Sequence, residues 1–304
     1  MNQTQTNRTL FITRVGTLVG KSCARLLIES LRSFGGAMQN CPFWIFEASP
    51  EKTACQDLID LNIKVLPLNA PAPQRDFLFG EKVYACAQAE LLAPPDTQSL
   101  VWIDPICLIV QPPLLYGLTS DYDAAFRPVH IRNVGLPANQ PLDTFWQKIS
   151  DIAGVKDIPM AVESFVDGQR LHAYFNSHAF AVNPQKGLMK RWLACFESLI
   201  NDQEFLSTIC QDENHQIFLF QAALSVVAAG SIDEKRLLIL PPVYNYPYNL
   251  YQSIPAKHRV KALNDLVSLV YEDRMINPRK IDDVEIRDPL YSWLMQRENI
   301  LPVF

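Results

Sequence analysis

The stretch from Leu100 to Pro113, LVWIDPICLIVQPP, constrains the fold more than any other part of the sequence. Residues 100–103 are all apolar, without the polar alternation of a strand that has one face in water. This pattern predicts a strand buried on both faces, as in a parallel sheet. Asp104 then stands at the carboxyl end of that strand, which is where ligands bind in open α/β sheets. The pair Asp104-Pro105 is equally consistent with an ordinary turn.

The segments before this stretch alternate between strand and helix patterns. Short apolar runs predict strands at Thr9–Thr13, Phe43–Glu47 and Lys64–Leu68, with helical segments between them. The first of these helices has an apolar stripe at helical spacing. The order predicts an α/β fold with a mixed, mainly parallel central sheet flanked by helices. The first strand, ending at Thr13, and the strand before Asp104 are then expected to end at the same edge of the sheet.

A further helix is expected over Gly80–Leu92, with Val83, Ala87 and Leu91 facing the core. Lys82 lies on another face, together with small alanine and cysteine residues. Small neighbours indicate close packing beside this lysine, which makes it a candidate for binding an anion. The commoner alternative for a lysine is an exposed position on the surface.

The second half of the chain supplies two more polar candidates. From Asp121 to Val166 an irregular segment is expected, and its charge cluster around Arg127, FRPVHIR, is typical of a solvated loop. Further on, Asp212 is a good N-cap for a long apolar helix. His215 and Gln216 fall in the first turn of that helix, where main-chain N–H groups favour anions. A neutral His215 could therefore face a phosphate or a sugar hydroxyl, although a histidine satisfied at a helix end is the commoner case.

The composition excludes several classes of protein. With 48% apolar and 19% charged residues, the chain is globular rather than disordered, and no apolar run is long enough to span a membrane. A net charge of −5 argues against nucleic acid as a partner. The polar start MNQTQTNRTL lacks the parts of a signal peptide, so a cytoplasmic location is expected. The seven cysteines include no CxxC pair, so neither a disulfide framework nor a zinc site is expected.

Several short motifs occur together and in a recognisable order. They are FIT at Phe11–Thr13, Lys82 within EKVYA, VWID at Val101–Asp104, FNS at Phe175–Ser177, DENHQ at Asp212–Gln216 and the LPPVYN loop that starts at Leu240. With these motifs the sequence resembles the GT-A nucleotide-diphospho-sugar transferases, in particular the retaining transferases related to glycogenin and to bacterial galactosyltransferases. The resemblance extends to about Asn249 and implies a hexosyl-type glycosyltransferase.

The resemblance also implies a domain organisation and partners. It implies a single GT-A-like domain over residues 1–304, with a nucleotide-binding half to about residue 112. The acceptor half and a C-terminal extension then occupy about residues 113–304. The implied donor is a nucleotide sugar, most commonly a UDP-sugar, and the implied acceptor is a glycan or small molecule. Neither nucleic acid nor an integral membrane segment is expected.

Members of this family hold a metal ion that this sequence is poorly equipped to bind. In the family a strand ends in Asp-x-Asp, and the two carboxylates hold a Mn²⁺ or Mg²⁺ ion that neutralises the donor diphosphate. Here Asp104 matches the first position, but Ile106 occupies the second and cannot ligate a metal. A third ligand, a histidine, is expected where this chain has Val270-Tyr271-Glu272. Asp104 is therefore the residual candidate for a metal. In addition, His178 replaces a family glycine and His215 replaces a family aspartate.

Two functions are consistent with these departures. The first is a glycosyltransferase that needs little or no help from a metal, with Asp104 at the ribose. Its residues would be Thr13, Arg14, Lys82, Asp104 and Arg127 at the donor nucleotide, and Asn176, His215 and Gln216 as catalytic residues near the sugar. The alternative is a catalytically inactive relative that binds a nucleotide, a glycan or a protein partner.

Overall fold

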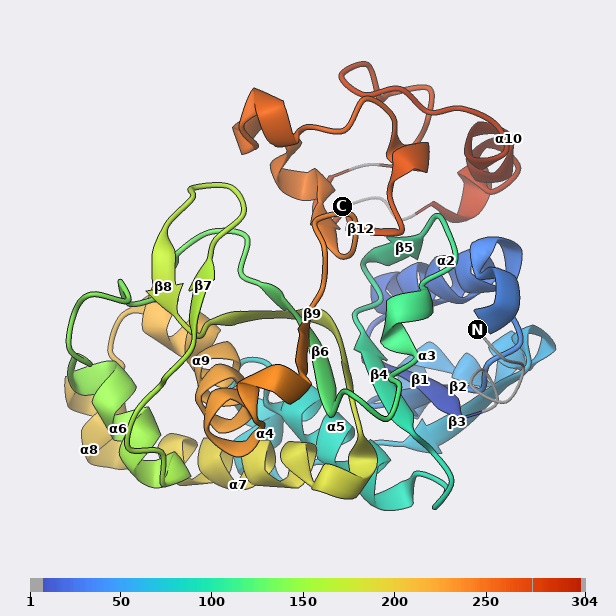
Figure 1. Ribbon diagram of the computed structural model, residues 1–304. Helices are drawn as coiled ribbons and strands as arrows, with labels where there is room; N and C mark the ends of the chain where they lie inside the picture. Colours follow the sequence, from blue (N-terminus) through green and yellow to red (C-terminus); the bar gives the residue numbers. More distant parts are fainter. Residues whose placement is uncertain (1–7, 275, 302–304) are drawn as a thin grey trace. The chain divides into compact units, whose positions relative to one another are not determined.

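Parallel strands form the start of the fold, as the sequence predicts. β1 (Thr9–Val15) pairs with β2 (Phe43–Glu47), and β2 pairs with β3 (Ile63–Pro67), both in parallel. Phe11 lies beside Phe43 in the register of the first pair, and their rings stack with centroids 6.1 Å apart. The computed structural model describes residues 8–274 and 276–301, so most of the polar N-terminal segment discussed above lies outside it (Figure 1).

The chain folds into two units, each built from segments that are distant in the sequence. Unit 1 contains Met1–Pro67, Val101–Gly117 and Pro241–Phe304, and unit 2 contains Leu68–Leu100 and Leu118–Leu240. The apolar strand expected before Asp104 is β4 (Ser99–Ile103), and it is buried along its whole length. β4 begins in unit 2 and ends in unit 1.

Unit 1 combines the parallel strands with a small second sheet. α2 (Leu18–Phe34) follows β1 and is capped by Thr17, whose hydroxyl accepts a 3.0 Å hydrogen bond from Gly20 N. The predicted apolar stripe is the buried face of this helix. The small sheet has the strand order β11-β12-β5. Its strands and the other helices of the unit are β5 (Cys107–Ile109), β11 (Tyr246–Pro247), β12 (Ser268–Val270), α3 (Pro50–Thr53) and α10 (Leu290–Met295).

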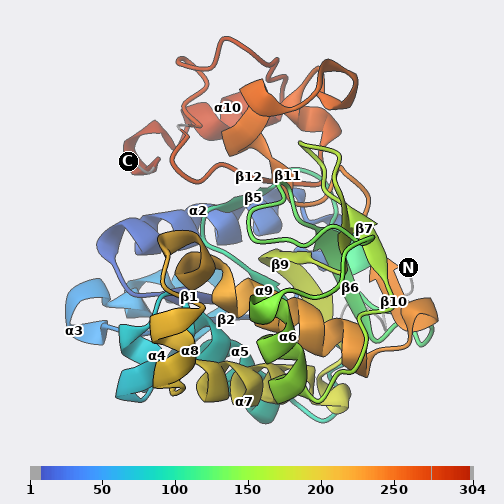
Figure 2. The same cartoon turned by 90° about the vertical axis from the view of Figure 1, so that its left-hand side faces the viewer.

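Unit 2 has strands on one side and a layer of helices beside them (Figures 1 and 2). β10 (Leu237–Ile239) pairs in parallel with β6 (Ala124–Pro128), and β6 pairs antiparallel with β9 (Phe175–Val182). β7 (Ala161–Glu163) and β8 (Arg170–His172) form a separate antiparallel pair. α5 packs on α7, α7 on α9, and α9 on α6. The helices are α4 (Ala72–Asp76), α5 (Gly80–Leu92), α6 (Thr144–Ala153), α7 (Leu188–Ile200), α8 (Gln203–Thr208) and α9 (Glu213–Ser231).

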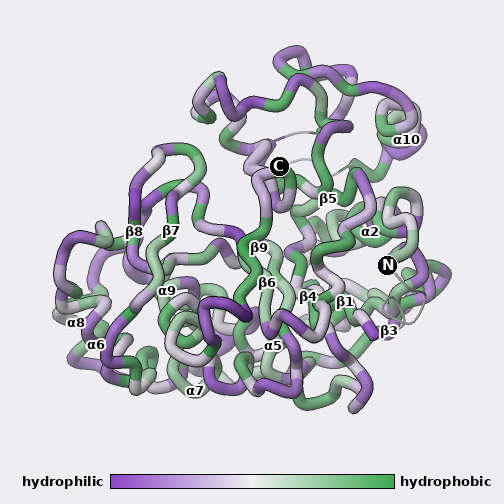
Figure 3. Tube along the Cα trace, viewed as in Figure 1, coloured by the Kyte–Doolittle hydropathy of each residue, from purple (hydrophilic) through white to green (hydrophobic). Residues whose placement is uncertain are grey.

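Apolar side chains fill the interior of both units, and the trace of β9 is largely hydrophobic (Figure 3). All seven cysteines are buried as thiols. Within residues 8–274 and 276–301, none of the helices has both the length and the apolar character that crossing a membrane requires. The mixed, mainly parallel α/β architecture that the sequence predicts is confirmed.

Two local expectations are wrong. Val83 is fully buried, as predicted, but Leu91 does not face the core and is 82% exposed, because the buried face of α5 also carries the small residues and Lys82. The segment from Asp121 to Val166 is not irregular throughout, since it contains β6, α6 and β7. Arg127 therefore lies on a buried strand and not in a solvated loop.

Candidate active site

Unit 1 brings Arg14 and Asp104 together at the carboxyl ends of two strands. Burial lowers the pKa of Arg14, and the negative charge of Asp104 partly offsets this effect, so the two groups lie within electrostatic range. The indole Nε1 of Trp102 donates a 2.9 Å hydrogen bond to Asp104 Oδ1 and fixes this carboxylate. Thr13, on β1, is fully buried. Its side chain is thus closed to solvent, whereas Arg14 and Asp104 are half-buried.

The segment expected to supply a third metal ligand does pack against the turn that contains Asp104. Tyr271 N donates a 3.1 Å hydrogen bond to the carbonyl of Ile106, and the Tyr271 hydroxyl donates a 3.4 Å bond to the carbonyl of Pro105. Burial raises the pKa of the Tyr271 phenol well above its ordinary value, so this side chain stays neutral. Glu272 is turned toward Asn249, whose Nδ2 donates a hydrogen bond to it.

These residues do not fit a divalent metal ion. Hard cations such as Mn²⁺ and Mg²⁺ need several oxygen ligands, usually including carboxylates. Next to Asp104 the chain offers an aliphatic Ile106 and a neutral, buried Tyr271. Across residues 8–274 and 276–301, no three or more His, Cys, Asp or Glu side chains gather in a way that could hold a metal.

In unit 2, Lys82 is buried and makes a direct contact with β9. Its side chain is only 4% exposed, so the interpretation as a surface lysine is wrong. Lys82 Nζ donates a 2.8 Å hydrogen bond to the carbonyl of Ser177 and lies 5.4 Å from the centre of the Phe220 ring. Ser177 N and Oγ donate hydrogen bonds of 3.1 and 3.0 Å to Gln221 Oε1 on α9. α5, β9 and α9 are thus joined through polar groups at one point.

A second cluster of polar side chains lies at the end of β6 and the start of β9. Arg127 is opposite Asn176 in the antiparallel register, is 4% exposed, and has its guanidinium 4.8 Å from the centre of the Phe165 ring. Asn176 Oδ1 accepts a 2.8 Å hydrogen bond from His178 N and lies 3.0 Å from His178 Nδ1. The His178 ring stacks on that of His130, with centroids 6.1 Å apart and planes 7° apart.

His215 and Gln216 lie in the first turn of α9, as predicted. Their side chains contact residues just before the helix and its capping residue. Asp212 caps the helix by accepting a 3.1 Å hydrogen bond from His215 N, and its second oxygen lies 2.5 Å from His215 Nδ1. The His215 ring packs on Phe145 at 4.5 Å between centroids. Gln216 Nε2 donates to the main-chain carbonyls of residues 210 and 211.

Two residues of α9 that hydrogen-bond to β9, Gln221 and Ser225, were missed by the sequence interpretation; Ser225 Oγ accepts a 2.9 Å bond from Phe175 N. Gln221 is buried and accepts both hydrogen bonds from Ser177. The available signal was its position, because a glutamine in the middle of an almost entirely apolar helix needs a polar partner.

The arrangement suits an anionic ligand. Lys82 and Arg127 are both buried cations in unit 2, and a charge removed from bulk water interacts more strongly with an opposite charge. In unit 1, taken by itself, Asp104 is a half-buried carboxylate that can accept hydrogen bonds from hydroxyl groups. Cationic side chains such as Lys82 and Arg127 are suited to bind phosphate oxygens.

Comparison with known proteins identifies the family and the fold of the chain. The sequence model of the Rhodobacterales glycosyltransferase domain matches residues 9–231. A search of curated protein sequences finds no match. The fold is similar to that of the galactosyltransferase LgtC, solved in complex with donor and acceptor sugar analogues. The TM-score is 0.52 at 13% identity, and 96% of this chain and 95% of that chain are covered.

A second similar structure is the apo form of the bifunctional glycosyltransferase WbbM. It has a TM-score of 0.53 at 13% identity, and the match covers 96% of this chain and 52% of WbbM. This chain therefore spans about half the length of that protein. At such low identity, both structures show a shared fold.

Proposed function

Because the chain belongs to the Rhodobacterales glycosyltransferase domain family, we propose that it transfers a sugar from a nucleotide-diphospho-sugar donor to an acceptor. The GT-A fold expected from the sequence agrees with the structural matches. The observation that supports the proposal best is the burial of Lys82 and Arg127 near the start of β9. Two buried cations are what an enzyme needs if the leaving group is a diphosphate.

The roles of the residues follow from their chemistry. Asp104 would accept a hydrogen bond from a ribose hydroxyl, and Arg14 would lie beside it. Thr13, which is buried on β1, would support the end of that strand. Lys82 and Arg127 would bind the diphosphate. Asn176 would contact the sugar, as would His215 and Gln216 at the start of α9. A UDP-sugar is the proposed donor, a glycan or small molecule the acceptor, and the cytoplasm the site of action.

We further propose that this transfer does not depend on a divalent metal. A unit charge pair at 4 Å is worth on the order of 4 kcal/mol at an effective dielectric constant of 20, before desolvation is subtracted. Two such cations would therefore replace much of the stabilisation that a metal gives to a departing diphosphate. The surroundings of Asp104 support this view, because Ile106 and Tyr271 supply no second carboxylate.

Calorimetric titration with UDP, GDP and their common sugar conjugates tests the proposal. Each ligand is titrated once in the presence of Mn²⁺ and once in the presence of EDTA. We expect saturable binding of one donor with a similar Kd in both conditions, and release of the nucleoside diphosphate when a glycan acceptor is added. Binding that requires Mn²⁺ would contradict metal independence. If no nucleotide binds in either condition, the inactive, partner-binding alternative replaces the proposal.

A further inference from the structure

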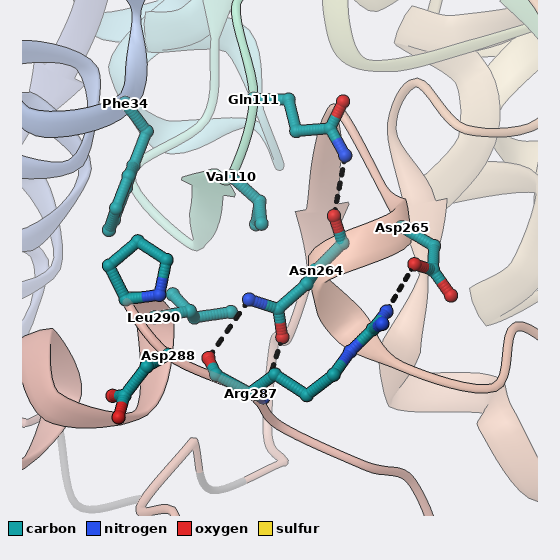
Figure 4. Close-up of a pocket in the computed structure, with 9 residues that line it drawn as sticks. Phe34, Val110, Gln111, Asn264, Asp265, Arg287, Asp288 and Leu290 are labelled. Carbon is teal, nitrogen blue, oxygen red and sulfur yellow. Dashed lines mark hydrogen bonds and ion pairs between the residues drawn. The ribbon is translucent and has the colours of Figure 1, made fainter.

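A pocket in unit 1 is lined by none of the residues assigned to the donor. It has a volume of about 380 Å³ and lies between the end of α2, the segment after β5 and the C-terminal segment (Figure 4). One part of its wall is apolar and consists of Phe34, Val110, Pro289 and Leu290. The other part is polar and consists of Gln111, Asn264, Asp265, Arg287 and Asp288.

The polar part of the wall is held in place by hydrogen bonds between distant segments. Asn264 Nδ2 donates 2.9 Å to the carbonyl of Arg287, and Arg287 N donates 2.7 Å to Asn264 Oδ1. Gln111 Nε2 donates 2.5 Å to the carbonyl of Asn264. The Arg287 guanidinium is ion-paired with Asp265. These bonds, visible in Figure 4, fix the amide groups of the wall before any ligand arrives.

The apolar part is held equally firmly by the closing helix. Trp293 of α10 meets the Phe34 ring at 5.3 Å between centroids and an angle of 61°. Trp293 Nε1 also donates a 2.8 Å hydrogen bond to Ser33 Oγ. The Arg297 guanidinium lies 4.0 Å from the Trp293 ring and is ion-paired with Glu29 at 2.6 Å. Phe34 is thus a fixed aromatic element at the edge of the pocket.

The charges of the wall decide which ligands are suitable. Among the described residues that line the pocket, Arg287 is the one cation, and it is already paired with Asp265. Asp288 adds a second carboxylate, and hydrogen bonds from Ser292 lower the pKa of that carboxyl, so it is ionised at neutral pH. The pocket therefore disfavours phosphates and other anions. A wholly apolar ligand would remove the charged Asp288 carboxylate from water without offering it a hydrogen bond.

We propose that this pocket binds one neutral pyranose unit of a glycan. A pyranose has an apolar face of C–H groups, which would lie against Phe34, and a rim of hydroxyls, which would bond to Gln111 and Asp288. The volume is within the range of about 300–1,000 Å³ typical of small-molecule sites. The site goes beyond the proposed transferase function, because nothing in it requires a donor or a transfer step.

Saturation-transfer NMR on the full chain tests this inference. The probes are the methyl glycosides of glucose, galactose and N-acetylglucosamine, with glucose 1-phosphate as the anionic counter-probe. We expect saturation transfer to at least one neutral glycoside, and an at least fivefold smaller effect with glucose 1-phosphate. Phe34→Leu, which keeps apolar volume but removes the aromatic face, should reduce the signal at least fivefold. Tyr291→Leu, which changes an exposed aromatic on the same closing helix, should not.

Asp288→Ala is the second test, because this exposed side chain supplies the carboxylate; circular dichroism checks that losing its hydrogen bonds from Ser292 leaves the fold unchanged. This variant should also reduce the signal. The inference is overturned if no neutral glycoside shows saturation transfer, or if Phe34→Leu and Asp288→Ala both behave like Tyr291→Leu. Nucleotide titration of the same samples keeps the two proposals apart, since glycoside binding without nucleotide binding would support this site and contradict the transferase.

Discussion

The ammonium group of Lys82 donates a 2.8 Å hydrogen bond to the main-chain carbonyl of Ser177, 95 positions later in the chain. This bond connects the first turn of α5 to the start of β9, and Ser177 in turn donates to Gln221 on α9. The orientation of Asn176 and His178, on either side of Ser177, therefore depends on a cation that lies on another element. Lys82 therefore has two roles: it holds the residues of the proposed sugar site in place, and it supplies a positive charge next to that site.

Lys82→Met tests this double role, because methionine keeps most of the side-chain stem and removes the charge. We expect the affinity for the nucleotide sugar to fall about tenfold or more, which corresponds to the roughly 1.5–3 kcal/mol of a hydrogen bond to a charged group. Calorimetry measures the change, and circular dichroism checks that the fold is kept. Lys148→Met, at a partly exposed lysine paired with Asp202, is the control and should bind normally.

Asp104→Asn tests the carboxylate at the end of β4. Asparagine still accepts the hydrogen bond from Trp102 but carries no charge, so the fold should be unaffected. We expect kcat/KM of the transfer reaction to fall by about 10- to 100-fold, as for the loss of about 1.4–2.7 kcal/mol of transition-state stabilisation. Asp96→Asn, at an exposed aspartate in the same unit as α5, should keep the wild-type rate. Equal rates for the two variants would remove Asp104 from the site.

Ile106→Asp should create a second carboxylate beside Asp104, so that a divalent metal ion can bind. A second carboxylate two positions after Asp104 gives two hard oxygen ligands on one short turn. We expect saturable Mn²⁺ binding in this variant, measured by the loss of the free Mn²⁺ signal in electron paramagnetic resonance, and much weaker binding in the wild type. Ile106→Asn is the matched control without the charge. Equally tight Mn²⁺ binding by wild type and variant would show that Asp104 has other ligands.

The ion pair between Asp123 and Arg236 should make the stability of the protein depend on pH. Hydrogen bonds from Arg236, at 2.6 and 2.8 Å, and the charge of Lys186 lower the pKa of this buried carboxyl below its ordinary value of 3.8. A carboxyl with a lowered pKa in the folded state stabilises the protein above about pH 4, and this contribution is lost as the pH falls through the folded-state pKa.

Asp123→Asn should therefore lower Tm at pH 7 by roughly 2 °C or more, as expected for about 1 kcal/mol in a chain of this size. The difference from wild type should shrink as the pH falls through the folded-state pKa of Asp123 and the native carboxyl becomes protonated. Thermal unfolding followed by circular dichroism at several pH values measures it. Asp157→Asn, at an exposed aspartate, should follow the wild-type curve throughout. A difference that does not shrink at all as the pH is lowered from 7 into the acid range would contradict an ionic origin.

Much of the fold could be predicted because local patterns and burial agree. The predicted strand Phe43–Glu47 has the bounds of β2, and the predicted helix Gly80–Leu92 has those of α5. The orientation of α5 could be predicted only in part, since Val83 is buried together with the small residues, whereas Leu91 and Leu92 are exposed. α5 packs closely on α7 through the small face, which leaves Leu91 exposed at the far end.

The site was harder to predict, because its contacts join residues far apart in the sequence. Arg127 in FRPVHIR has the local composition of a solvated loop, and it is buried because β9 pairs with its strand and Phe165 covers its guanidinium. Gln221 has no motif around it, and its partner Ser177 lies 44 positions away. Such pairings depend on tertiary contacts that a pattern along the chain does not contain.

The discontinuity of unit 1 has a consequence for how the protein is made. β5 is synthesised early, but its antiparallel partner β12 comes much later, and the Tyr271 that seals the Asp104 turn follows Pro105 by 166 positions. During synthesis, the edge of β5 and the turn with Asp104 therefore stay unpaired and exposed until β12 and Tyr271 have left the ribosome. An unpaired edge of this kind can pair with other chains. We therefore expect a version that stops at Ser231, the end of the family match, to aggregate rather than form a smaller transferase.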